Sequence, residues 1–327
     1  MVLLDIQKAF DKVWIDGLLH KMIKQEYPKY LIKLIHSYIT ERTFKVVYNS
    51  SKSTTRKTRA GVPQGSVLGP QLFKIYLNDI PEFQKTKMAL FADDTALYAH
   101  SFNAIVAAKQ IQIHIYELQK YYDKWKIQIN PDKTKVIVFS KKRKESKIFT
   151  PITLYNKKTT TLNSVKYLGV HLDSKLTYRI HIKQSIKKVY AVMKKIYPLM
   201  VKNSAVQIKN KKLLYTTILR PIIMYAVPVW CSTAPTNIKP LQVFQNKCLR
   251  LMLSRDRYEK IKTLHEDARV PLISDYIRET AQKFYTTKIK NINKLLNGIG
   301  DIRINNSVLK IKHKLPYQRL PIYQSPI

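Results

Sequence analysis

Two adjacent aspartates, Asp93 and Asp94, interrupt an otherwise apolar stretch and limit what that part of the chain can form. Apolar residues dominate on both sides of the pair between residues 87 and 99, which predicts a β-hairpin with the carboxylates in its turn. Charged groups in apolar surroundings are costly unless they bind something. Because successive strand residues point to opposite faces, the two carboxylates are expected to contribute unequally to any site.

A third aspartate, Asp5, ends the apolar run Val2-Leu3-Leu4, and residues 1–6 are predicted to form a buried strand. Adjacent carboxylates repel each other, and a divalent cation removes that repulsion. Oxygen ligands without nearby Cys or His favour Mg²⁺ or Mn²⁺, and two such ions would serve in-line phosphoryl transfer. A solvated turn that carries two acids is the alternative, and the pair taken alone favours it.

The charge of the chain indicates a polyanionic partner. The 327 residues carry a net charge of +38, and residues 146–255 hold 20 basic residues against one acidic residue, Asp173. A field of this sign attracts phosphate polymers or anionic membranes, although an AT-rich coding sequence also enriches lysine. The longest apolar run contains Pro228 and is too short to span a bilayer. Two cysteines form no disulfide framework, so an intracellular protein without a membrane span is expected.

Hydrophobic periodicity predicts an α+β part followed by a helical part, with a boundary near residue 175. The predicted helices cover residues 14–40 (two helices broken near Tyr27-Pro28), 66–79 (Ser66 as N-cap), 104–125 and most of 178–296. The predicted strands cover residues 1–6, 42–49 paired with 54–60, 87–99, and short segments near 135–140, 152–159 and 165–172.

Five segments resemble, in order, motifs A to E of reverse transcriptases from non-LTR retrotransposons. They are Leu4 to Trp14 (LDIQKAFDKVW), Gly61 to Pro70 (GVPQGSVLGP), Phe91 to Asp94 (FADD), Asn130 to Lys135 (NPDKTK) and Tyr167 to Gly169 (YLG). Two further segments, around Leu219-Arg220-Pro221 to Trp230 and around Leu241-Gln242 to Gln245, resemble the region after the polymerase in jockey-like LINE-type elements.

The resemblance implies an α+β polymerase palm, a ferredoxin- or RRM-like antiparallel sheet with helices, followed by an all-helical thumb and a C-terminal helical region. The implied domains are a palm with partial fingers (1–175), a helical thumb or connection (176–255) and a basic C-terminal helical region with a poorly ordered tail (256–327). The match starts at motif A, so we expect an N-terminally truncated chain with its fingers largely missing and its first strand poorly anchored.

The resemblance also implies the catalytic residues. Asp5 and Asp93 are the expected main ligands of two Mg²⁺ (or Mn²⁺) ions, with Asp94 as a weaker ligand. Lys133 is expected to donate a proton to the leaving pyrophosphate. Phe10, five residues after Asp5, is expected to exclude the ribose 2′-hydroxyl, although a core phenylalanine is the simpler interpretation.

The remaining implied residues bind substrate. Gln64 and Gly65 are expected at the nucleotide, and the other positions at the template or primer: Gly61, Pro63, Tyr167, Leu168, Gly169, Lys183, Lys187 and Lys194. Solvated lysines and a simple turn before a helix are the alternatives. The implied partners are an RNA template, a DNA primer or RNA–DNA duplex, and deoxynucleoside triphosphates, in ribonucleoproteins of the nucleus and cytoplasm. The basic run Lys141-Lys142-Arg143-Lys144 is a candidate nuclear signal.

Three functions stay open at this stage. The first is RNA-directed DNA synthesis by target-primed reverse transcription. The second is a catalytically inactive, nucleic-acid-binding relic of such an element. The third is a relative of group II intron maturases, which share the palm but are disfavoured by the context of Trp14 and by the segment around residues 219–245.

Overall fold

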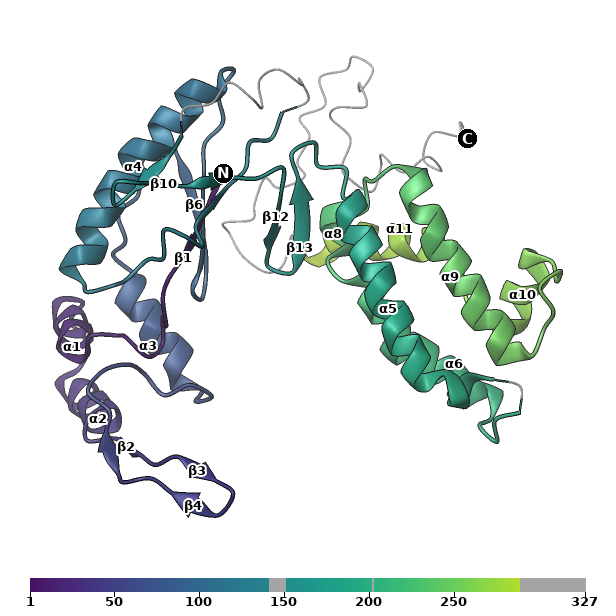
Figure 1. Cartoon of the computed structure of the whole chain (residues 1–327), viewed down its shortest axis with the longest axis horizontal. Helices are drawn as coiled ribbons and strands as arrows, with labels where there is room; N and C mark the ends of the chain where they lie inside the picture. The colour runs from purple at the N-terminus through teal and green to yellow at the C-terminus, as the bar shows by residue number, and fades with distance from the viewer. Residues whose placement is uncertain (141–150, 202, 289–327) are drawn as a thin grey trace. The chain divides into compact units, whose positions relative to one another are not determined.

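The computed structural model describes residues 1–140, 151–201 and 203–288, and it divides into two compact units, Met1–Gly169 and Val170–Ile327 (Figure 1). The division falls slightly before the predicted boundary near residue 175. Two expectations, the basic run 141–144 and the poorly ordered tail, lie outside the described residues. Within the described part, no helix combines the length and apolar character needed to cross a membrane.

The first unit is built on a five-stranded sheet with the order β11-β8-β1-β7-β6. Its strands are β1 (Val2–Asp5), β6 (Lys87–Phe91), β7 (Asp94–Tyr98), β8 (Lys135–Val136) and β11 (Thr160–Thr161). β1 pairs antiparallel with both β7 and β8, and Val2 and Leu4 are buried. The expectation that the first strand is poorly anchored was therefore wrong, because long-range pairing holds it on both sides.

Strands β6 and β7 form the predicted hairpin with a two-residue turn at Ala92 and Asp93. Their exposure differs from the expectation. β7 is buried from Thr95 to Leu97, but β6 lies at the edge of the sheet, with Leu90 and Phe91 exposed. The carboxylates at the turn are thus accessible to solvent rather than enclosed by apolar side chains.

Helices α1 (Ile15–Lys24), α2 (Lys29–Ile39) and α3 (Leu68–Leu77) connect β1 to β6, and α4 (Ala104–Lys124) connects β7 to β8. α4 buries the predicted apolar stripe, including Ile111, Ile115 and Leu118, in one core with β1. The break at Tyr27-Pro28 is confirmed. α3 begins one residue later than a Ser66 N-cap requires, yet the Ser66 hydroxyl accepts a hydrogen bond from the Gly69 amide at 2.9 Å.

A buried lysine connects three of these helices. The Lys21 ammonium on α1 donates to the Tyr76 carbonyl on α3 (2.5 Å), to the Asp79 carboxylate (2.5 Å) and to the Tyr121 hydroxyl on α4 (2.8 Å). It also lies 3.8 Å from the centroid of the Trp125 ring. Burial lowers the pKa of Lys21. Burial acts to raise the pKa of Asp79, but hydrogen bonds from Lys21 and Tyr121 hold that pKa below its ordinary value.

Four short strands, β2 (Thr43–Phe44), β3 (Val47–Tyr48), β4 (Ser51–Lys52) and β5 (Arg56–Lys57), form a hairpin between α2 and α3, with β2 paired to β5 and β3 to β4. The continuous strands expected over 42–49 and 54–60 are therefore interrupted. Two further hairpins are made by β9 (Thr153–Leu154) with β10 (Lys157–Lys158), and by β12 (Ser164–Tyr167) with β13 (Val170–Asp173).

The described part of the second unit is helical after β13. Its α-helices are α5 (Arg179–Met200), α6 (Ile208–Leu214), α7 (Arg220–Met224), α8 (Val227–Trp230), α9 (Pro235–Leu253), α10 (Ile261–Ala268) and α11 (Ile273–Lys283), with π-helical turns at Tyr215–Leu219 and Phe284–Lys288. Trp230 and Leu241, both from the jockey-like segments, are buried in its core. The Gln242 side chain bonds to Asn246, Gln245 and the Ile273 amide, which ties α9 to α11.

Candidate active site

The three aspartates singled out by the sequence meet at one end of the sheet. Asp5, the last residue of β1, lies directly opposite Asp94, the first residue of β7. Asp93 occupies the neighbouring turn, where Ala92 adopts a left-handed backbone with a φ of 52°. A non-glycine residue in this region is uncommon and is held there by the pairing around it. Long-range register, rather than sequence proximity, brings the carboxylates together.

Partial desolvation and electrostatic repulsion both act on this cluster. Burial raises the pKa of Asp94, and the charges of Asp93 and Asp5 raise it further. The Lys133 ammonium lies 3.9 Å from a carboxylate oxygen of Asp5, and both side chains are solvent-accessible. Lys133 is thus paired with one of the three carboxylates, Asp5.

The donor set fits a hard divalent cation, because it consists of carboxylate oxygens that repel one another when no cation separates them. The geometry, however, does not already converge on a point. Among the described residues, no group of three or more His, Cys, Asp or Glu side chains is placed to hold a metal ion. The sequence-predicted metal ligands are thus neighbours in register, without a preformed coordination shell.

Backbone pairing positions Lys133. The Gln7 amide donates to the Gln128 carbonyl at 2.7 Å, and the Asn130 amide donates to the Asp5 carbonyl at 2.9 Å. The Asn130 side chain then accepts from the Asp132 amide at 3.0 Å and closes the turn. Residues 128–130 therefore run beside the end of β1, and the turn that follows carries Lys133 to the carboxylates.

The motif B loop is bonded to the turn that follows Asp5. The Gly61 amide donates to the Val13 carbonyl at 2.8 Å, and the Val62 amide donates to the Phe10 carbonyl at 2.7 Å. Gly61 has a φ of 87°, and a Cβ at this position would lie 2.6 Å from the Asp11 carbonyl oxygen. Gly65 also has a positive φ, 82°, but nothing lies within 4 Å of its Cβ position. Gly61 thus permits close packing, whereas Gly65 borders open space.

The other motif A and motif B residues occupy two environments. Phe10 is half-buried and stacks against Phe73, with ring centroids 5.0 Å apart. Gln64 is exposed, and its amide donates to the Asp11 carboxylate at 2.8 Å. The Pro63 carbonyl accepts from the Ser66 hydroxyl at 2.9 Å, so Pro63 shapes the start of α3.

The motif E residues end in a tight turn. Leu168 and Gly169 have positive φ values of 43° and 80° between β12 and β13, as two-residue hairpin turns require. Tyr167 is half-buried, and burial raises its pKa, with a further contribution from the charge of Asp94. Tyr167 therefore lies within electrostatic reach of the carboxylate cluster.

Residues 1–172, more than half of the chain, match the family model described as "Reverse transcriptase (RNA-dependent DNA polymerase)". This chain belongs to the reverse transcriptase family. Among its relatives are the "Probable RNA-directed DNA polymerase from transposon X-element" of Drosophila melanogaster, 33% identical over 92% of this chain, and that of transposon BS, 31% identical over 86%. The "RNA-directed DNA polymerase from mobile element jockey" of the same species is 29% identical over 93%. The chain is thus related to the polymerases of jockey-like non-LTR retrotransposons.

This reverse transcriptase chain spans about a third of the length of those relatives, since the match covers 32% to 34% of each. A telomerase from Candida albicans, in a structure with a telomeric RNA fragment, is 13% identical, with a TM-score of 0.45 over 86% of this chain and 43% of that one. Membership of the family implies nucleic-acid substrates and the use of divalent metal.

The three lysines predicted to bind template or primer lie in the second unit, whereas the three aspartates lie in the first. Lys183, Lys187 and Lys194 are exposed on α5, whereas Ile182, Val189 and Met193 of the same helix are buried. The spacing places the three lysines along one face. They form a basic surface of the second unit.

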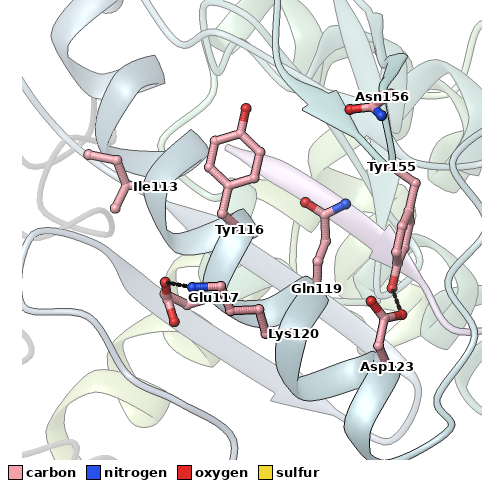
Figure 2. A pocket seen from close by; sticks show the side chains of 8 residues that line it. All are labelled: Ile113, Tyr116, Glu117, Gln119, Lys120, Asp123, Tyr155 and Asn156. Carbon is pink, nitrogen blue, oxygen red and sulfur yellow. Dashed lines mark hydrogen bonds and ion pairs between the residues drawn. The ribbon is translucent and has the colours of Figure 1, made fainter.

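A shallow pocket of about 600 Å³ lies on α4 and the β9–β10 turn (Figure 2). Its lining residues are Ile113, Tyr116, Glu117, Gln119, Lys120, Asp123, Tyr155 and Asn156. The Tyr155 hydroxyl donates to the Asp123 carboxylate at 2.7 Å. The pocket contains none of the sequence-predicted site residues, so it gives no support to their assignment.

Two residues that support the site went unassigned in the sequence. Asp11 holds Gln64, and its position within motif A was the available signal. The Arg42 guanidinium bonds to the carbonyls of Ile39, Ala60 and Gly61 at 3.0, 3.2 and 2.5 Å. No local pattern around Arg42 indicates this role, because Ala60 and Gly61 come close to Arg42 only where the chain leaves the hairpin.

Proposed function

We propose that this chain carries the catalytic part of an RNA-directed DNA polymerase of a jockey-like non-LTR retrotransposon. It adds deoxynucleotides to a primer 3′-hydroxyl on an RNA template, as in target-primed reverse transcription. The observation that carries the proposal is the cross-strand pair of Asp5 and Asp94 with Asp93 in the adjoining turn. Membership of the reverse transcriptase family supports it.

The strand order supports a palm. β8-β1-β7-β6 is an antiparallel arrangement in which helices connect β1 to β6 and β7 to β8, the pattern of a ferredoxin-like β-α-β-β-α-β unit. We assign the palm with partial fingers to residues 1–175 and the helical thumb to 176–255, with the following basic helical region forming the C-terminal part.

In this proposal Asp5 and Asp93 are the main carboxylate ligands of two Mg²⁺ or Mn²⁺ ions, and Asp94 is a weaker one. When bound, the cations supply charge neutralisation for the triphosphate and favour the ionised primer hydroxyl. Lys133 holds a proton at Nζ, 3.9 Å from the Asp5 carboxylate, and would pass it to the leaving pyrophosphate. The Asp5 carboxylate, the ion-pair partner of Lys133, orients that ammonium.

The remaining residues bind substrate. Phe10 excludes the ribose 2′-hydroxyl, Gln64 and Gly65 contact the nascent base pair on the open side of the motif B loop, and Tyr167 supports the primer end. The exposed lysines Lys183, Lys187 and Lys194 contact duplex phosphates, with Gly61, Pro63, Leu168 and Gly169 shaping the backbone around the primer–template. Because target-primed synthesis uses a DNA primer and an RNA template, we propose that the protein acts in ribonucleoproteins of the nucleus and cytoplasm.

Primer extension tests the proposal. The full chain is incubated with a DNA primer annealed to an RNA template, deoxynucleotides and Mg²⁺, beside Asp93→Asn and the control Asp256→Asn. Asp256 is exposed and lies outside all five motifs. Extension by the wild type and by the control, but not by Asp93→Asn, is the expected result. Salt-sensitive duplex binding without any extension would identify a nucleic-acid-binding relic instead.

A further inference from the structure

The hairpin arm, residues 43–57, lacks a core of its own. It contains β2, β3, β4 and β5 and extends from the end of α2 (Figure 1). Every residue from 43 to 57 is exposed, including Phe44 at 50% and Tyr48 at 76%. A two-stranded hairpin without further packing is only marginally stable in water. A group of exposed aromatic and aliphatic side chains on such an arm marks a binding surface.

The charge of the arm selects the kind of partner. Between residues 42 and 60 the chain has six basic residues and no acidic one; they are Arg42, Lys45, Lys52, Arg56, Lys57 and Arg59. A second copy of this chain, with a net charge of +38, would be repelled. A polyanion is attracted, and its counterions are released on binding.

Cross-strand register places apolar and basic side chains together. Phe44 lies opposite Arg56, and Val47 lies opposite Lys52. Directly opposed residues of an antiparallel pair share a face of the sheet. Aromatic side chains beside cations are the combination that binds single-stranded nucleic acid, because unstacked bases stack on the rings while the cations contact phosphates. In a duplex the bases are already stacked on one another and cannot occupy the rings.

The base of the arm is bonded to the candidate active site. The Thr58 amide donates to the Arg42 carbonyl at 2.7 Å, and the Arg42 side chain bonds to the Gly61 carbonyl at 2.5 Å. Gly61 in turn is bonded to Val13, in the segment that follows Asp5. The arm is therefore connected, through Arg42 and Gly61, to the loop that carries Gln64 and Gly65.

From these observations we propose that the hairpin arm binds single-stranded template nucleic acid through stacking on Phe44 and Tyr48 and a phosphate contact from Arg56, which lies opposite Phe44. The proposal rests on the function proposed above. It adds a binding surface for the strand that has not yet been copied, on an element distinct from the carboxylates and from the lysines of α5.

Fluorescence anisotropy tests the arm without requiring catalysis. The probes are a 5′-fluorescein 20-nucleotide oligouridylate and a blunt duplex of the same length. The test variant of the full chain is Phe44→Ala/Tyr48→Ala. The control is Tyr30→Ala/Phe102→Ala, which removes two aromatics of the same unit that are more exposed as a pair; Tyr30 is 75% exposed and Phe102 fully exposed. Because none of the four side chains belongs to the core, the fold is expected to survive, and circular dichroism checks this.

We expect the arm variant to weaken oligouridylate binding about tenfold or more while duplex binding changes by less than about twofold. Arg56→Gln should lower the slope of log K against log salt by about 0.7, the value for one lost phosphate contact on a single strand. Equal oligouridylate affinities for the arm variant and the control would overturn the proposal. So would an equal loss of duplex binding, because the arm would then be a general phosphate contact.

A crosslink supplies an independent readout. Irradiation of the wild type with 4-thiouridine-substituted oligouridylate should label peptides that contain Phe44 or Tyr48; labelling confined to other segments would contradict the assignment. Asp93→Asn separates this proposal from the proposed function, since it should abolish extension and leave arm-dependent binding intact. If extension fails in every variant while the arm still binds oligouridylate, the proposed function fails and the arm assignment stands.

Discussion

The two glycines of the motif B loop give a sharp test of the structure, because they share a backbone conformation and differ in surroundings. Gly61 and Gly65 have φ values of 87° and 82°. For an alanine this conformation costs about 1–2 kcal/mol. At Gly61 the new Cβ would also lie 2.6 to 2.7 Å from three backbone atoms of Phe10 and Asp11, and relieving such overpacking costs a further ~1–3 kcal/mol.

Gly61→Ala is therefore expected to destabilise the first unit by about 2–5 kcal/mol, and Gly65→Ala by only about 1–2 kcal/mol. For a unit of 169 residues, each kcal/mol lowers the melting temperature by roughly 2–4 °C. Thermal and urea unfolding of the full chain, followed by circular dichroism, measures both losses. Equal losses, or a neutral Gly61→Ala, would refute the packing of motif B against the turn after Asp5.

The same two variants also test the proposed function, through their effects on primer extension. Its Cβ would project into open space, where the proposed function places the nascent base pair. We expect this variant to retain most of its stability and to lose primer extension, whereas Gly61→Ala loses activity in proportion to its unfolding. Full extension by a folded Gly65→Ala would contradict that placement.

Three further predictions follow from the side chains around the site. Lys21 and Tyr121 lower the pKa of Asp79 in the folded protein, although burial opposes the shift. The ionised Asp79 carboxylate therefore stabilises the fold above its ordinary pKa of 3.8, and this contribution is lost as the pH falls through the lower pKa of the folded state. Asp79→Asn should remove this acid-sensitive part of the free energy of unfolding, measured with urea at several pH values. Asp5→Asn should stabilise the metal-free chain by ~0.2–1 kcal/mol, because like charges oppose each other across β1 and β7; a destabilised Asp5→Asn, measured in EDTA, would rule out repulsion as the dominant interaction. Phe10→Ala should admit ribonucleotides into the extended primer, measured by alkaline cleavage of the product; unchanged sugar discrimination in an active variant would show that Phe10, stacked on Phe73, serves only the core.

Local patterns predicted much of the first unit. The stripe of α4 and the break at Tyr27-Pro28 follow from periodicity and from proline chemistry. The hairpin that carries Asp93 follows from two apolar runs around a polar turn. These features depend on residues close together in the chain, and sequence spacing is informative at that range.

Features that depend on contacts between distant parts of the chain could not be predicted from local sequence patterns. Nothing near Lys21 in sequence indicates that it is buried, since Asp79 and Tyr121 reach it from other helices. The exposure of β6 depends on its place at the sheet edge, which composition does not determine. The family resemblance implied that Asp5, Asp93 and Asp94 share metal ions, but the opposition of Asp5 and Asp94 was not predicted, because antiparallel register between distant strands is set by the whole sheet.

The most direct test of the central claim is single-nucleotide extension of a DNA primer on an RNA template by the full chain, with Mg²⁺ titrated from zero. We expect Mg²⁺-dependent extension by the wild type and by Asp256→Asn, and none by Asp5→Asn or Asp93→Asn, each of which should still bind the primer–template. Extension by Asp5→Asn or Asp93→Asn at the wild-type rate would contradict the assignment of these paired carboxylates as the catalytic centre.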